Sequence, residues 1–85
     1  MTDKRALWEW RASRRLSRRA LAELAKVSEG TVESIENGRH PPSLKTMRRI
    51  AGVFDVGLDA VDWEAGARER DEREERDAKT LAPVA

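Results

Sequence analysis

The chain has 85 residues, of which 39% are charged and 5% aromatic, and its formal net charge is +1. This length makes one small domain, and the absence of cysteine excludes a disulfide framework and a thiolate metal site. No apolar run is long enough to cross a membrane, and the first ten residues lack the apolar core of a signal peptide, so we expect a cytoplasmic protein.

Charge is unevenly distributed along the chain. Residues 1–63 carry 12 Lys and Arg against nine Asp and Glu, whereas residues 64–85 carry five against seven. A basic globular part followed by a mixed-charge tail is compatible with a nucleic-acid-binding protein. A solvated charged surface would have the same composition, so charge alone leaves both interpretations open.

The first helix is expected from about Asp3 to Ser13, where Leu7 and Trp10 lie on one face. Two shorter helices are expected over about 18–25 and 29–37, because apolar residues again recur at helical spacing. Those apolar residues are Leu21, Leu24, Ala25, Val32 and Ile35.

The two short helices are separated only by a tight turn at residues 26–28. Ser17 and Ser28 stand where each helix begins and can accept hydrogen bonds from its free backbone N–H groups. Isolated helices under about 12–15 residues are marginal in water, so both must pack on other elements. The second helix can then present its outer face, which is the helix-turn-helix arrangement used to read the DNA major groove.

The next elements follow Gly38, a helix stop because glycine adopts the left-handed conformation at low cost. Two prolines stiffen the loop at 39–42, and Ser43 caps a helix over 44–54. A short fifth helix is expected from Leu58 to about residue 63. The core residues expected from these two helices are Leu44, Met47, Ile50, Ala51, Phe54, Leu58 and Val61.

The last part of the chain, residues 65–85, is a charged tail with almost no apolar residue before residue 80. It is either a solvated helix held by Glu–Arg pairs or a disordered segment, and it lacks the apolar stripe needed to hold a fixed position on the core. We therefore divide the chain into a helix-turn-helix DNA-binding domain over residues 1–64 and a tail over 65–85.

Three stretches together resemble the Cro-like and phage-repressor-like (Xre-type) helix-turn-helix domain: LSRRALAELAKVSEGTVESIENG, PPSLKTMRRIAGVFDV and LDAV. The similarity covers roughly residues 5–62. It implies an all-α, five-helix lambda-repressor-like bundle in which the third helix is the recognition helix. It also implies that the partner is double-stranded DNA, bound by a homodimer on two half-sites about one DNA turn apart.

The resemblance also implies which residues contact DNA. They would come from the start of the second helix, from the recognition helix and from the loop that follows it: Ser17, Arg18, Arg19, Ser28, Glu29, Gly30, Thr31, Glu33, Ser34, Asn37, Arg39 and His40. Arg18 falls where relatives often carry a Gln that touches phosphate or base. Asn37 and Arg39 fall where relatives usually grip the DNA backbone.

The recognition helix departs from its relatives because it carries Glu29, Glu33 and Glu36 and no basic residue. A glutamate can accept a hydrogen bond from cytosine N4, but each carboxylate also approaches a polyanion. Affinity would then depend on flanking cations: Arg14, Arg15, Arg18, Arg19, Lys26, Arg39 and Lys45. Lys26 stands where relatives often have glycine. A lysine at this position costs roughly 1 kcal/mol in stability if its φ is positive.

Relatives also pair an Arg of the first helix with the Glu of the Ile-Glu-Asn-Gly motif, which here implies a partly buried pair of Arg11 and Glu36. Two separate surface charges are the alternative. Trp8 lies off the buried stripe of the first helix and either covers that helix or contributes to a dimer surface, where aromatic residues are enriched. The candidate dimer residues are Trp8, Leu58, Val61 and Trp63.

No cofactor, metal site or enzymatic activity is expected. His40 is the single histidine, it lies beside two prolines, and no nucleophile–base set, metal-ligand spacing or Gly-rich phosphate loop accompanies it. The sequence therefore predicts a sequence-specific operator-binding regulator of bacterial or phage origin, acting as a repressor or autoregulator. The alternative is an antitoxin or adaptor of the same fold that binds a protein partner, such as a toxin or a polymerase subunit.

Overall fold

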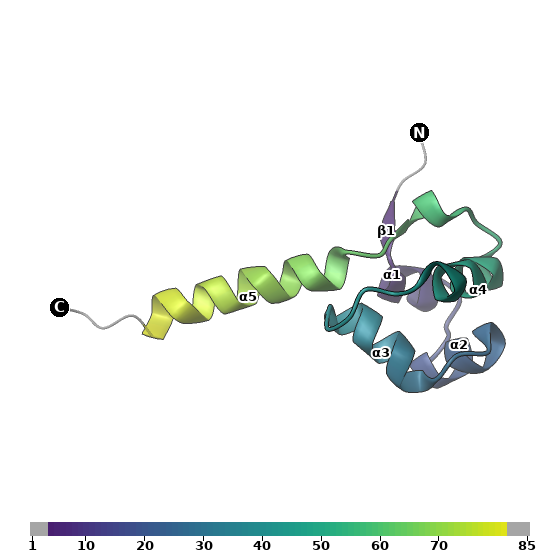
Figure 1. Cartoon of the computed structure of the whole chain (residues 1–85), viewed down its shortest axis with the longest axis horizontal. Helices are drawn as coiled ribbons and strands as arrows, with labels where there is room; N and C mark the ends of the chain where they lie inside the picture. The colour runs from purple at the N-terminus through teal and green to yellow at the C-terminus, as the bar shows by residue number, and fades with distance from the viewer. Residues whose placement is uncertain (1–3, 82–85) are drawn as a thin grey trace.

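The computed structural model describes residues 4–81, with side chains described through residue 78. Four helices form a bundle: α1 (Leu7–Ser13), α2 (Arg18–Ala25), α3 (Glu29–Asn37) and α4 (Leu44–Phe54). A 3₁₀ turn η1 (Leu58–Ala60) and a short strand β2 (Val61–Asp62) follow, and β2 pairs in parallel with β1 (Arg5–Ala6). The chain then enters α5 (Ala65–Leu81), which projects away from the bundle (Figure 1).

Helices α2, α3 and α4 begin and end at the residues that the sequence predicts. Each begins after a serine whose side chain accepts the backbone N–H of the third residue beyond it; the serines are Ser17, Ser28 and Ser43. Each ends at a residue in the left-handed conformation, with φ of 58° at Lys26, 70° at Gly38 and 55° at Asp55. These local start and stop signals fix the lengths of the three helices.

The core lies between these helices and the segment that contains β2. Its fully buried side chains are Leu21, Val32, Ile50, Phe54 and Val61. The ring of Trp10 packs on that of Phe54 with 5.9 Å between centroids, and the Trp10 Nε1 donates to the Ala60 carbonyl at 3.0 Å. The predicted all-α helix-turn-helix bundle is therefore confirmed.

Two predicted helices differ from the structure. The first begins at Leu7, because residues 5–6 form β1, and Asp3 lies outside the described residues. The predicted fifth helix over residues 58–63 is wrong, since only Leu58–Ala60 makes a helical turn and Val61–Asp62 is extended. The reason is tertiary, because Arg5 at the start of the bundle pairs with Val61 at its end in a parallel ladder. The apolar spacing within residues 58–63 carries no information about such a distant partner.

Two leucines predicted to be buried are exposed: Leu24 by 58% and Leu44 by 48%. In α2 the core face is formed by Leu21, Ala22 and Ala25, and Leu24 lies roughly 100° from Ala25 around the helix. Leu44 is the first residue of α4, at the outer end of the helix. Both positions therefore contribute apolar area to the surface.

The charged tail forms a helix through residue 81, and residues 82–85 lie outside the described residues. Its first turn packs on α3 even though it lacks an apolar stripe. A Cβ on Gly66 would lie 2.4 Å from the Glu36 carbonyl oxygen, and one on Gly38 would lie 2.3 Å from the Ala67 nitrogen. Two glycines thus let the backbones touch, which corrects the expectation that the tail holds no fixed position. None of the described helices is long and apolar enough to cross a membrane.

Candidate nucleic-acid interface

The outer face of α3 lies opposite the core. Val32 and Ile35 are buried on one side, whereas Gly30, Glu33, Ser34 and Asn37 follow one another at helical spacing on the other. Gly30 is exposed, and a Cβ added there would meet nothing closer than the Ser28 hydroxyl, 3.9 Å away. We call this set of four residues the outer face of α3, and at Gly30 it leaves the helix backbone open to close approach.

A groove runs beside this face, between α3, the loop at residues 40–43 and the start of α4. Apolar and hydroxyl side chains line it together, and two pairs of hydroxyl groups are mutually bonded: Ser28 with Thr31 at 2.7 Å, and Ser43 with Thr46 at 3.0 Å. The first turns of α3 and α4 both border the groove. Helix N-termini and hydroxyl groups are ready donors to phosphate oxygens, so this groove is suited to a nucleic-acid backbone.

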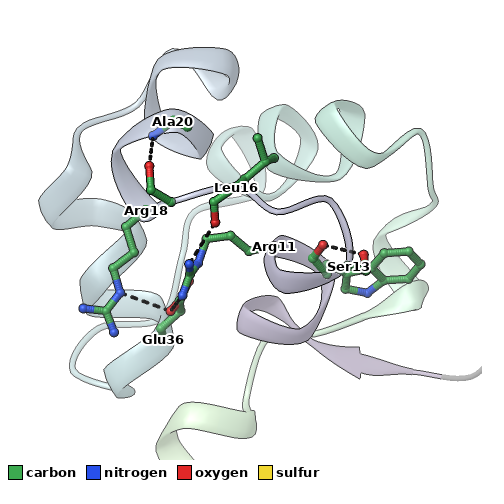
Figure 2. Close-up of polar contacts among 8 residues, drawn as sticks. Arg11, Ser13, Leu16, Arg18, Ala20 and Glu36 are labelled. Carbon is green, nitrogen blue, oxygen red and sulfur yellow. Dashed lines mark hydrogen bonds and ion pairs between the residues drawn. The ribbon is translucent and has the colours of Figure 1, made fainter.

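Glu36, the last carboxylate of α3, does not belong to the outer face. Its side chain is only 3% exposed and receives Arg11 Nε at 2.9 Å, Arg11 Nη2 at 3.1 Å and Arg18 Nε at 3.2 Å. Figure 2 shows both arginines pointing at this one carboxylate from α1 and α2. Arg11 Nη1 also donates to the Leu16 carbonyl at 2.9 Å, which ties the chain between the two helices into the network.

This network changes the charge that α3 offers to a partner. With Glu36 neutralised by two arginines, Glu29 and Glu33 are the carboxylates that remain accessible. Glu29 is in the first turn of α3, where a negative charge is favourable beside the helix dipole. Glu33 lies on the outer face itself and is half-buried.

Arg18, which was predicted as a DNA contact, belongs to the Glu36 network. Its Nε donates a hydrogen bond to Glu36, and its two terminal nitrogens have no hydrogen-bond partner among the described residues. The guanidinium, with 39% of the side chain exposed, is thereby oriented at the start of α2. Ser17, by contrast, uses its side chain as the cap of that helix.

The other predicted cations are dispersed around the domain. The Arg19 side chain is 79% exposed and makes a 3.4 Å pair with Glu23, while Lys26, Arg39, His40 and Lys45 are exposed. Arg14 is also exposed, and its Nη2 donates to the Phe54 carbonyl at 3.4 Å. Arg15 has a φ of 55°, a left-handed turn residue that sequence reasoning did not anticipate.

Of the four candidate dimer residues, Trp8 has 46% of its surface exposed. Val61 has none exposed, because it packs into the core from β2, so it cannot contact a second copy and is withdrawn from the set. Leu58 and Trp63 are half-buried, and the Trp63 Nε1 donates to the Leu58 carbonyl at 3.0 Å.

Sequence reasoning missed residues of two elements that border α3, the start of α4 and the first turns of α5. Ser43 was assigned only a capping role and Thr46 none, although both line the groove beside α3. The repeated Ser-x-x-Thr spacing at residues 28–31 and 43–46 is the signal that could have paired these helix starts. Arg70 and Arg73 of α5, which lie beside Asn37, were also missed.

Two short helices joined by a three-residue turn, the second with a solvent-facing outer side, define a helix-turn-helix domain. The sequence model of the helix-turn-helix family matches residues 9–61, more than half of the chain. The chain therefore belongs to this family of Xre-type, lambda-repressor-like DNA-binding regulators. Comparisons with curated proteins and with solved structures gave no match.

Proposed function

We propose that this protein binds operator DNA sequence-specifically, as a homodimer, and acts as a transcriptional repressor or autoregulator of bacterial or phage origin. The observation that carries the proposal is the outer face of α3, bordered by a groove that two helix starts and their hydroxyl groups line. In this reading α3 enters the major groove and the groove beside it receives the phosphate backbone.

Glu33 would supply direct readout. A carboxylate on the outer face accepts a hydrogen bond from cytosine N4, and no basic side chain of α3 is present to compete for guanine. Arg18, with its terminal nitrogens available, would contact a phosphate and offset part of the repulsion between Glu33 and the DNA. We therefore expect operators that present cytosine at the position facing Glu33.

The experiment is selection of bound duplexes from a random library, followed by salt-dependent mobility shifts. Glu33→Gln should lose discrimination at one C·G pair, because a good base contact is worth about 1–3 kcal/mol. Glu9→Gln, an exposed carboxylate on α1, is the matched control and should leave the selected site unchanged. A Glu33→Gln variant that selects the same site as the wild type contradicts the assignment.

Arg18→Ala should weaken binding to all duplexes and reduce the slope of log K against log salt by about 1 if it contacts a phosphate. Because Arg18 also binds Glu36, its fold must be checked by thermal melting before the slope is interpreted. An unchanged slope with discrimination lost at one base pair would instead make Arg18 a base reader.

The dimer rests on Trp8, the exposed aromatic of α1. Two half-sites bound together add avidity that one domain lacks. Trp8→Glu should therefore remain folded and lose cooperative operator binding, which sedimentation and two-half-site shifts would measure. Retained cooperativity in this variant would remove Trp8 from the interface.

A second candidate function, a protein-binding antitoxin or adaptor, is favoured by one observation. Residues 68–78 of α5 are all exposed, so a long helical surface is open to a partner. A wild-type protein that shifts no duplex at any salt concentration would favour this second candidate over operator binding.

A further inference from the structure

A polar recess lies between the end of α3 and the first turns of α5. Asn37 and Arg39 line it on one side, and Gly66, Arg70 and Arg73 line it on the other. We call it the α5 recess. Asn37 also belongs to the outer face of α3, so the recess continues the surface proposed to meet DNA.

Helical register places the two α5 arginines toward α3. Gly66 marks the side of α5 that touches α3, because its Cβ position falls 2.4 Å from the Glu36 carbonyl oxygen. Arg70 and Arg73 follow Gly66 by four and seven residues and therefore share its face. Asp71 and Glu75 follow Gly66 by five and nine residues and lie on the other side of the helix.

The recess has cations without partners. Among the described residues, the side chains of Arg39 and Arg73 make no hydrogen bond or ion pair. Arg70 pairs with Glu74 at 3.3 Å, but the two side chains are 48% and 66% exposed, and such surface pairs are weak. All three arginines are exposed, and Arg39 and Arg73 are not held by any other described side chain.

Two carboxylates oppose them. Glu36 is already bound by Arg11 and Arg18, which leaves Glu69 as the carboxylate that faces an incoming anion. Even with Arg70 paired to Glu74, Arg39 and Arg73 outnumber Glu69, so the recess has a net positive charge.

The direction of α5 is fixed at its first turn. The Gly38 and Gly66 contacts hold its backbone against α3, and Arg68 donates both terminal nitrogens to the Asp62 carboxylate of β2. Arg70 and Arg73 are therefore presented on a rigid element, which reduces the entropy lost when they bind a ligand.

We propose that the α5 recess binds a phosphate of the DNA backbone next to the base pairs that α3 reads, making α5 a second DNA-contacting element. The inference rests on the proposed function and extends it to a part of the chain outside the matched residues 9–61. Continuity with Asn37 and the unpaired Arg39 and Arg73 favour a backbone phosphate over an acidic protein partner.

The test compares the full-length chain with single variants on one operator duplex, from 0.1 to 1 M salt. Arg73→Ala should reduce the slope of log K against log salt by about 0.9. The ratio of wild-type to variant affinity should therefore be about eight times larger at 0.1 M salt than at 1 M. The variant's ratio of specific to non-specific affinity should stay the same, because phosphate contacts do not read sequence. Arg76→Ala removes the same charge one turn further along α5, outside the recess, and should keep the wild-type slope.

A reciprocal pair of variants adds a gain of affinity that a damaged fold cannot imitate. Glu69→Gln should tighten DNA binding, whereas Glu75→Gln on the other side of α5 should leave it nearly unchanged. Equal effects of Arg73→Ala and Arg76→Ala, in a wild type that binds DNA, overturn this inference and leave the proposed function standing. Absence of DNA binding by the wild type overturns both.

Discussion

Glu36→Gln tests the charge network that joins α1, α2 and α3. The carboxylate is 3% exposed and accepts three hydrogen bonds from two arginines, at 2.9, 3.1 and 3.2 Å. Glutamine keeps the shape and one acceptor oxygen but replaces the other with an NH₂ group that faces arginine donors. The variant therefore loses the negative charge and leaves Arg11 and Arg18 side by side without compensation.

The expected loss is close to the lower end of the range for a buried pair. Breaking a buried pair by removing one partner costs about 3–5 kcal/mol. Here Arg11 is 21% and Arg18 39% exposed, so water can solvate part of the uncompensated charge. We therefore expect about 3 kcal/mol, which for a domain of this size lowers Tm by about 12–24 °C.

Thermal melting followed by circular dichroism measures this loss. Glu23→Gln is the matched control, because its pair with Arg19 is 79% and 71% exposed and should contribute about 0–0.5 kcal/mol. A Glu36→Gln protein that melts within about 2 °C of the wild type would refute the reasoning, since such a network could then contribute no more than a surface pair.

Three further predictions concern turns and the placement of α5. Lys26→Gly should raise stability by at most about 1 kcal/mol in urea unfolding, because Lys26 has a φ of 58°; a lower midpoint would contradict this. Gly66→Val should displace α5 and expose it to trypsin, because a Cβ there falls on the Glu36 backbone, whereas Gly52→Ala has open space and should stabilise α4; an unchanged digest of Gly66→Val would contradict the contact. The Arg68 hydrogen bond lowers the pKa of Asp62 below its ordinary 3.8, so its stabilising effect is complete above that value and is lost as the pH falls through the folded-state pKa. Unfolding free energies of the wild type and Asp62→Asn should thus differ at pH 7 and converge below about pH 3.8; a constant difference down to pH 2 would contradict this.

The lengths of α2, α3 and α4 could be predicted because their signals are local. In α3 the cap, the buried positions and the stop all lie between Ser28 and Gly38, so no distant contact is needed to interpret them. The same signals predict which face of α3 is buried and which is open. The helix-turn-helix and its outer face are therefore properties of the sequence itself.

Contacts between distant residues were decided by the tertiary structure. Arg5 pairs with Val61, so a segment with helical periodicity becomes a strand, because its backbone partner comes from the other end of the bundle. Arg18 joins Glu36 across 18 positions of the chain, which the resemblance did not imply.

The placement of α5 has the same physical origin. Its sequence has helix-forming residues and charge pairs but no apolar stripe, so nothing local indicates what it packs against. Gly38 and Gly66 are 28 positions apart in the chain. Their lack of a Cβ matters only because the backbones of α3 and α5 meet at these two residues in the folded structure. Local signals are sufficient for the helices of the bundle, whereas the recess beside Asn37 exists only because folding brings α3 and α5 together.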